Sequence, residues 1–220
     1  MRRIAIFAVP LFALLLAASS ATAVHDHHNK MPMMWPPGHT RSITADAQAQ
    51  IYEAPMSLAY PEFLSVYGCS YGHKRSYFFG PVPYGSPSGA GGISREILNG
   101  PNVAYEEVEN KPCCQHWWVV VRDLSDGHVL HRLPTGIPIK PEPLSVGIGL
   151  AVSIVVKRDG SVAWIVETGE EEGRYQVHAV DKSGSRVLAS SPDIDPTSLA
   201  LAGSTLYWTQ GAQPFSAPLN

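Results

Sequence analysis

The stretch SIVVKRDGSVAWI, residues 153–165, is the clearest indication of the fold, because two short apolar runs flank an Asp-Gly turn. Glycine tolerates the positive φ that a tight hairpin requires, so such a pair between two apolar runs is a strong hairpin signal. The run YQVHAVD (175–181) follows, then the turn Ser183-Gly184 and the run RVL (186–188). Residues 153–188 therefore predict four consecutive antiparallel strands.

The same order of runs and turns occurs on both sides of this unit. Residues 93–131 contain four similar runs with turns at Asn99-Gly100 and at Ser125-Asp126-Gly127. A third unit begins at Leu199 and ends weakly at Leu219. Two runs at 66–71 and 75–79 match the last two strands of a preceding unit. Counted in this way, the strands make two full units. The remaining strands together make about one more unit, so the chain has about three units in all.

Repeated units of four antiparallel strands are typical of the blades of a β-propeller. The segments RDGSVAW (158–164) and SLALAG (198–203) resemble exported actinobacterial proteins related to WD-repeat and TolB-type propellers. That resemblance implies a fold and an interaction role and carries no catalytic residues. We expect an all-β, partial β-propeller-like domain of repeated four-stranded antiparallel units over residues 61–220, preceded by an irregular N-terminal tail.

The first 23 residues have the three regions of a secretion signal. Arg2 and Arg3 give a positive start, residues 4–18 are apolar, and Ala21-Thr22-Ala23 is an A-x-A cleavage site. The apolar run is shorter than the roughly twenty residues that a membrane-spanning helix needs. We therefore expect a signal peptide over residues 1–23, a secreted mature chain that begins at Val24, and no membrane span after cleavage.

Charge excludes one class of partner. The formal net charge is −3, and removal of Arg2 and Arg3 takes it to −5. Nucleic acids and anionic membranes are bound through clustered Lys and Arg side chains. The mature chain is therefore not expected to bind nucleic acid.

Residues 24–60 form a His-, Met- and Pro-rich segment without clear periodicity, which predicts an irregular tail or linker. Imidazole nitrogen and thioether sulfur together suit copper or zinc. The candidate metal ligands are His25, His27, His28, Met31, Met33 and Met34. The alternative is a solvated tail with no ligand role.

The three cysteines are Cys69, Cys113 and Cys114. Outside the cytoplasm thiols tend to pair, and adjacent cysteines rarely form a disulfide with each other because the geometry is strained. We expect Cys69 to pair with Cys113 or Cys114, which leaves one thiol free or bonded to another chain.

No group of residues forms a recognisable catalytic site. Glu106, Glu107 and Glu109 are acidic neighbours, and so are residues 170–172, but glycoside hydrolysis needs two carboxylates at a set separation that a sequence does not give. The recurring aromatic residues Tyr105, Trp164 and Trp208 are expected in the core.

The sequence thus predicts a non-enzymatic binding or scaffold protein for an unknown protein or cell-surface ligand. The alternative is a copper- or zinc-binding protein that acts through its tail. A homodimer would give about six blades and close the exposed strand edges, since full propellers have about four to eight. The other arrangement is an open monomer whose edges are covered by Pro-rich loops.

Overall fold

The structure is a computed structural model that describes residues 40–57, 60–82, 91–110, 115–135, 149–168 and 173–220. It is all-β, as the sequence predicted, and its strands form four antiparallel sheets. In the described part of the chain, no helix is long and apolar enough to cross a membrane.

Each of the first two sheets contains four strands in sequence order. The first sheet consists of β1 (Arg41–Ala45), β2 (Ala49–Ser57), β3 (Tyr60–Ser70) and β4 (Arg75–Pro81). The second sheet consists of β5 (Ile93–Asn99), β6 (Asn102–Asn110), β7 (Gln115–Asp123) and β8 (Val129–Pro134).

The third sheet repeats this order, and the fourth has three strands. The third sheet consists of β9 (Ala151–Val156), β10 (Val162–Glu167), β11 (Tyr175–Asp181) and β12 (Gly184–Ser191). The fourth consists of β13 (Ala200–Ala202), β14 (Thr205–Gln210) and β15 (Gln213–Pro218). The hairpin predicted from residues 153–165 is β9–β10, and its turn residue Gly160 has the positive φ, 87°, that the prediction required.

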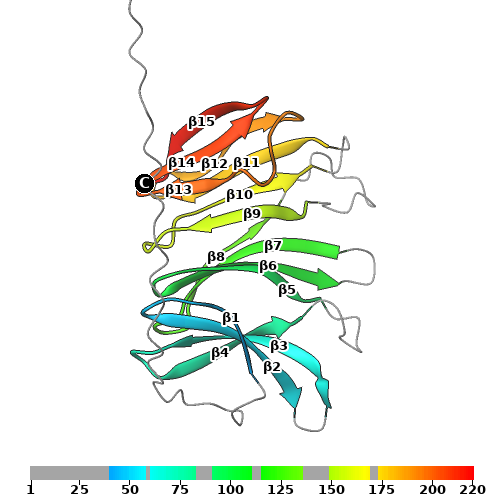
Figure 1. Cartoon of the computed structure of the whole chain (residues 1–220), viewed down its shortest axis with the longest axis vertical. Coiled ribbons are helices and arrows are strands. Elements are labelled where there is room, and N and C mark those ends of the chain that lie inside the picture. Colours follow the sequence, from blue (N-terminus) through cyan, green and yellow to red (C-terminus); the bar gives the residue numbers. More distant parts are fainter. Residues whose placement is uncertain (1–39, 58–59, 83–90, 111–114, 136–148, 169–172) are drawn as a thin grey trace, which may run out of the picture.

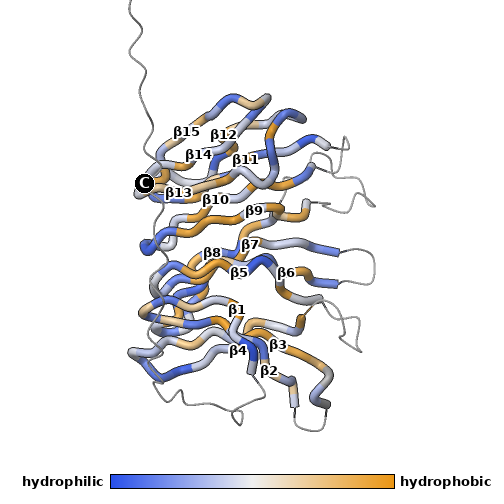
Figure 2. The backbone as a smooth tube through the Cα atoms, viewed as in Figure 1, coloured by the Kyte–Doolittle hydropathy of each residue, from blue (hydrophilic) through white to orange (hydrophobic). Residues whose placement is uncertain are grey.

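The four sheets are stacked face to face in chain order (Figure 1). Three apolar clusters lie between them: one joins the first and second sheets, one the second and third, and one the third and fourth. Hydrophobic residues accordingly follow the strands of the third sheet, which has a neighbour on both faces (Figure 2). Repeated four-stranded sheets stacked in this way are consistent with β-propeller-like blades.

One aromatic side chain recurs in the second strand of each later sheet. Tyr105 in β6, Trp164 in β10 and Trp208 in β14 are all buried. Each belongs to the cluster that its sheet shares with the preceding sheet. The prediction that these residues are core is confirmed, and in each of these three sheets the aromatic residue packs against the sheet before it.

The boundary predicted at residue 60 is wrong, because β1 and β2 occupy residues 41–57. Their turn contains no glycine, so it gave no hairpin signal. Instead, Asp46 Oδ1 accepts hydrogen bonds from the backbone N–H groups of Gln48 and Ala49 at 2.7 and 3.0 Å. Such a side-chain turn replaces the glycine that most tight hairpins need.

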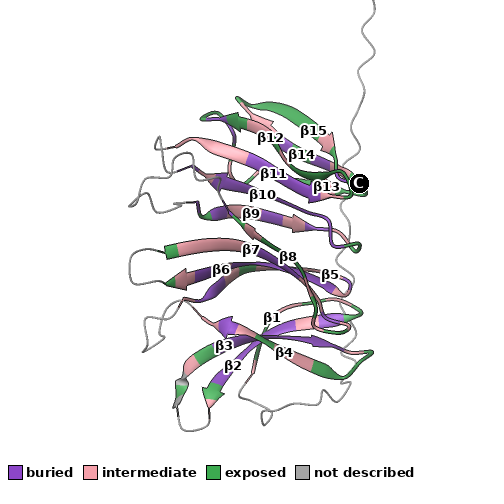
Figure 3. Cartoon of the chain, turned by 180° about the vertical axis from the view of Figure 1, so that it is seen from behind, coloured by how far each residue is buried: buried purple, intermediate pink, exposed green. Residues whose placement is uncertain are grey.

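The predicted strand count changes for the same reason. The first sheet is complete with its own four strands, so it does not share strands with the last one. The chain thus forms four stacked sheets rather than about three. The fourth sheet ends the stack, and β15 is exposed along almost its whole length (Figure 3).

Candidate functional site

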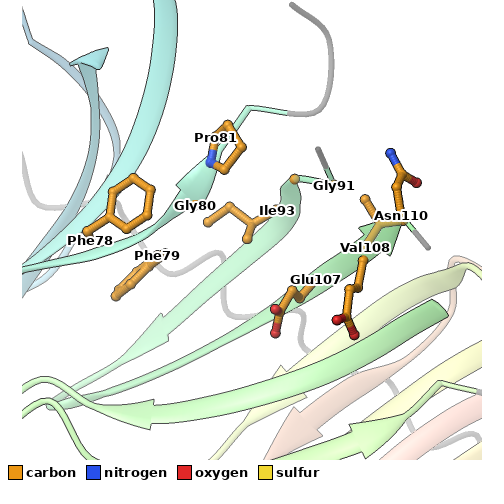
Figure 4. Close-up of a pocket in the computed structure, with 11 residues that line it drawn as sticks. Phe78, Phe79, Gly80, Pro81, Gly91, Ile93, Glu107, Val108 and Asn110 are labelled. Atoms are coloured by element: carbon orange, nitrogen blue, oxygen red, sulfur yellow. The ribbon is translucent and has the colours of Figure 1, made fainter. Parts of the chain in front are cut away.

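A cleft of about 310 Å³ opens where the first sheet meets the second. One wall is the end of β4, from Phe78 to Pro81, and the other is the end of β6, from Glu107 to Asn110. Gly91, Gly92 and Ile93, at the start of β5, complete the lining (Figure 4). The cleft therefore joins strands from two different units of the repeat.

Aromatic stacking forms the closed side of the cleft. The ring of Phe79 stacks on that of Tyr105, with centroids 5.0 Å apart and planes 10° apart. The guanidinium of Arg122 lies over the Phe79 ring, 5.6 Å from its centroid, which is within the range of cation–π attraction. These contacts fix Phe79 between the two sheets.

Glycine is required at one edge of the cleft. A Cβ on Gly91 would lie 1.5 Å from the carbonyl oxygen of Val108, which is far inside van der Waals contact. The backbone N–H of Val108 donates to the carbonyl oxygen of Gly92 at 2.8 Å. The chain before β5 thus lies directly against β6 at the edge of the cleft.

The second wall carries a charged group built on β6 and β8. The Nε of Arg132 lies 3.1 Å from Oε2 of Glu107, and its Nη2 lies 3.5 Å from Oε2 of Glu109. The hydrogen bond to Glu107 raises the pKa of Arg132 further above its ordinary value. Two carboxylates therefore flank one guanidinium.

Arg132 is also held from the other side. Its guanidinium lies 4.2 Å from the centroid of the Trp118 ring, and the ring of His116 stacks on Trp118 at 6.4 Å. Glu107 is directly opposite Trp118 in the β6–β7 register, and Arg132 is directly opposite Val120, two residues along β7 from Trp118. A rigid aromatic platform therefore orients the charges beside the cleft.

The ring of Phe78 lies on the other face of β4, because Phe78 is directly opposite Tyr67 in the β3–β4 register. Its side chain is 52% exposed, and its ring makes an edge contact with Tyr67 at 5.6 Å. The Phe78 ring therefore points away from the carboxylates of β6, and Phe79 is the aromatic side chain of β4 that faces the second sheet.

The neighbouring carboxylate Glu106 points the other way, into the interface with the third sheet. It accepts hydrogen bonds from the backbone N–H of Ala151 at 2.6 Å and from Ser94 Oγ at 3.0 Å. Burial is the main cause that raises its pKa. Glu106 therefore links two sheets, and strand alternation separates it from Glu107.

In the described part of the chain Cys69 is a free, buried thiol, and no disulfide is seen there. It belongs to a cluster on the face of the first sheet that is turned away from the second sheet. Its predicted partners Cys113 and Cys114 follow β6 in the second sheet and lie outside the described residues. Compartment and cysteine count could not reveal which face Cys69 occupies.

The six candidate metal ligands of the tail also lie outside the described residues, as do the glutamates at 170–172. Within the described ranges, no group of three or more His, Cys, Asp or Glu side chains could hold a metal ion. Of the histidines, His178 is buried against Trp164, with ring centroids 5.0 Å apart.

Sequence reasoning did not identify the cleft, although part of it was visible. Alternation along β6 places Tyr105, Glu107 and Glu109 on one face. The opposite wall, from β4, is in another unit, and no local pattern brings it there. No protein-family model matches the chain, and no curated protein matches it either.

Proposed function

We propose that the chain is an exported, non-enzymatic β-propeller-like binding protein that holds its ligand in the cleft between the first two sheets. The observation that carries the proposal is the lining of that cleft, where the apolar end of β4 lies opposite two carboxylates, those of Glu107 and Glu109, that flank one guanidinium. Ligand sites are typically concave and largely apolar, with a few convergent polar groups.

The lining favours a ligand with a positively charged group next to an apolar part. A protonated amine or guanidinium would pair with Glu107 or Glu109, and an apolar stem would contact Pro81 and Ile93 in the lining. Lys and Arg side chains of a protein or cell-surface ligand have this chemistry, since each carries its charge on an apolar stem.

The arrangement of the two carboxylates favours binding over catalysis. Glu107 and Glu109 contact the same guanidinium, that of Arg132. Acid–base chemistry with two carboxylates needs environments that separate their pKa values, so that one is protonated while the other is ionised. Glu107 and Glu109 instead lie in one shared environment beside the same cation, which suits recognition of a second cation.

Calorimetry with the mature chain and an acetylated trilysine peptide tests the proposal, with triserine as the neutral control. We expect trilysine to bind, more weakly at high salt, and triserine not to bind. Glu107→Gln and Glu109→Gln should each weaken binding by about fivefold or more, the scale of one charge-assisted contact.

Two variants serve as controls. Phe215→Ala removes an exposed ring from the fourth sheet, and Asp126→Asn removes an exposed carboxylate from the turn after β7. Both should leave trilysine binding unchanged. Failure of trilysine to bind, or binding that survives Glu107→Gln together with Glu109→Gln, would overturn the proposed cleft.

A further inference from the structure

The first sheet has a second core on its outer face, which is the face turned away from the second sheet. This cluster contains residues of β2 and β3 alone: Tyr52, Ala54, Tyr67 and Cys69. Ser65 shares the face, because it is directly opposite Ala54 in the β2–β3 register. The rings of Tyr52 and Tyr67 stack at 5.6 Å.

The burial of this face exceeds what one sheet can provide. Tyr52 is 4% exposed, Tyr67 is 6% exposed, and Cys69 is 1% exposed. In the described part of the chain, the first sheet ends the stack and no other sheet lies over this face (Figure 1). Aromatic rings on a sheet face reach such exposures only beneath a second layer, because side chains stand perpendicular to the sheet.

Comparison with the later sheets indicates what should contact the outer face of the first sheet. Tyr52 lies in the second strand of its sheet, at the position that Tyr105 and Trp208 occupy in theirs. In the later sheets, this aromatic residue packs against the preceding sheet. Tyr52 is therefore the residue on which a preceding sheet would pack, and the described chain has none before β1.

We propose that the N-terminal segment Met31–Pro37 covers the outer face of the first sheet in place of a preceding sheet. The segment reads MPMMWPP, so it is apolar throughout, and three residues separate it in the sequence from Arg41 at the start of β1. Methionine fills irregular gaps in cores, and proline cannot donate a hydrogen bond to a strand edge.

The segment is long enough for this role. Seven extended residues span about 23 Å, whereas four strands are about 14 Å across. The hydroxyl of Ser65 is buried without a hydrogen-bond partner among the described residues. A proline-rich segment keeps backbone carbonyls free to accept that hydrogen bond.

Two other occupants fit less well. A second copy would offer the outer face of its fourth sheet, which would close a ring. That face is exposed and carries small and polar residues such as Ala200, Ala202 and Thr205, with Tyr207. The connection between β4 and β5 ends at Gly91, beside β6, on the opposite side of the first sheet.

Cys69 provides the reporter for a test, because burial both shields its thiol and raises its pKa. In a mature chain with Cys113→Ser and Cys114→Ser, the rate of reaction with Ellman's reagent is measured. Replacement of Met31, Met33, Met34 and Trp35 by serine should raise that rate by about tenfold or more, as protection falls with the lost covering layer.

Three controls separate packing from other causes. Serine at His25, His27, His28 and Asn29 should leave the rate unchanged. Leucine at the three methionines with Trp35→Phe should keep Cys69 protected, because it preserves apolar volume and removes the thioether ligands. A peptide of residues 31–39 added to a chain that begins at Thr40 should restore protection.

The proposal is overturned by any of three results. The first is unchanged reactivity of Cys69 in the serine variant with its strand circular dichroism intact. The second is failure of the added peptide to protect the truncated chain. The third is protection that disappears on dilution together with a dimer in light scattering, which would assign the face to a second copy. If the serine variant does not fold, the truncated chain with added peptide decides.

Discussion

Trp164 and Trp208 occupy the same position in successive sheets, yet only Trp164 has a partner for its indole N–H. Trp164 Nε1 donates to the backbone carbonyl of Thr135 at 2.8 Å, which ties the end of the second sheet to the third. Trp208 Nε1 is buried without a hydrogen-bond partner among the described residues. Replacement of each by phenylalanine removes the same atoms but only one hydrogen bond.

The difference between the two variants isolates that hydrogen bond. Both lose similar ring volume from nearly full burial, so the cavity contribution is comparable. Trp164→Phe also leaves the buried carbonyl of Thr135 unpaired, which costs about 1–3 kcal/mol. Trp208→Phe removes an unpaired N–H, which favours the variant. We therefore expect Trp164→Phe to lower the free energy of unfolding by about 2 kcal/mol more than Trp208→Phe does.

Urea unfolding followed by far-ultraviolet circular dichroism measures both variants, because strand content reports on all four sheets and does not depend on tryptophan fluorescence. The midpoints are converted to free energies with a common slope, which is valid only if the slope is unchanged. Equal losses in the two variants would refute the reasoning, since they would mean that the bond to Thr135 contributes nothing net.

Four further predictions concern the stability of the fold, the cleavage of the signal peptide and metal binding by the tail. Burial lowers the pKa of His178 to about 4, so its neutral form stabilises the fold above pH 6.5 and this contribution is lost as the pH falls toward 4. The free energy of unfolding should fall by about 3 kcal/mol over this pH range. His178→Gln should therefore flatten the pH dependence of the urea midpoint between pH 6.5 and pH 4. A pH dependence as steep as that of the unaltered protein would contradict this prediction. Gly91→Ala should cost about 2 kcal/mol or more in the same assay because its Cβ meets the Val108 carbonyl, whereas Gly72→Ala, with open space around its Cβ, should be neutral. Mass spectrometry of secreted protein should find an N-terminus within about two residues of Val24, and full-length protein in the membrane fraction would exclude cleavage. Calorimetry of a peptide of residues 24–39 should show Cu(II) or Zn(II) binding that weakens below about pH 6.5, because protonated imidazole cannot ligate; no heat at micromolar metal removes the metal hypothesis.

The sequence was most informative where structure depends on neighbours along the chain. The turn at Asp159-Gly160, with an apolar run on each side, correctly predicted the β9–β10 hairpin, and similar signals predicted the other strands of the second and third sheets. Where the turn used a different device, as at Asp46, the strands on either side were missed. Prediction thus succeeded and failed according to the local chemistry of single turns.

The candidate site was accessible only in part. Alternation along β6 places Glu107 and Glu109 on one face, and this follows from the sequence alone. Nothing local shows that β4 supplies the other wall of the cleft, since β4 belongs to another unit and a long connection separates the two strands. The direction in which Cys69 points, away from the second sheet, was equally hidden.

The sequence by itself determined an all-β chain of antiparallel hairpins, because strand pairing between consecutive runs depends on turns and on a two-residue period that local residues encode. The tertiary structure alone decided how the sheets stack, which strands line the cleft, and which face of the first sheet holds Tyr52 and Cys69. The physical reason is that burial of apolar area has no direction. Many pairings of apolar faces satisfy it equally, and only the packing of the whole chain selects one.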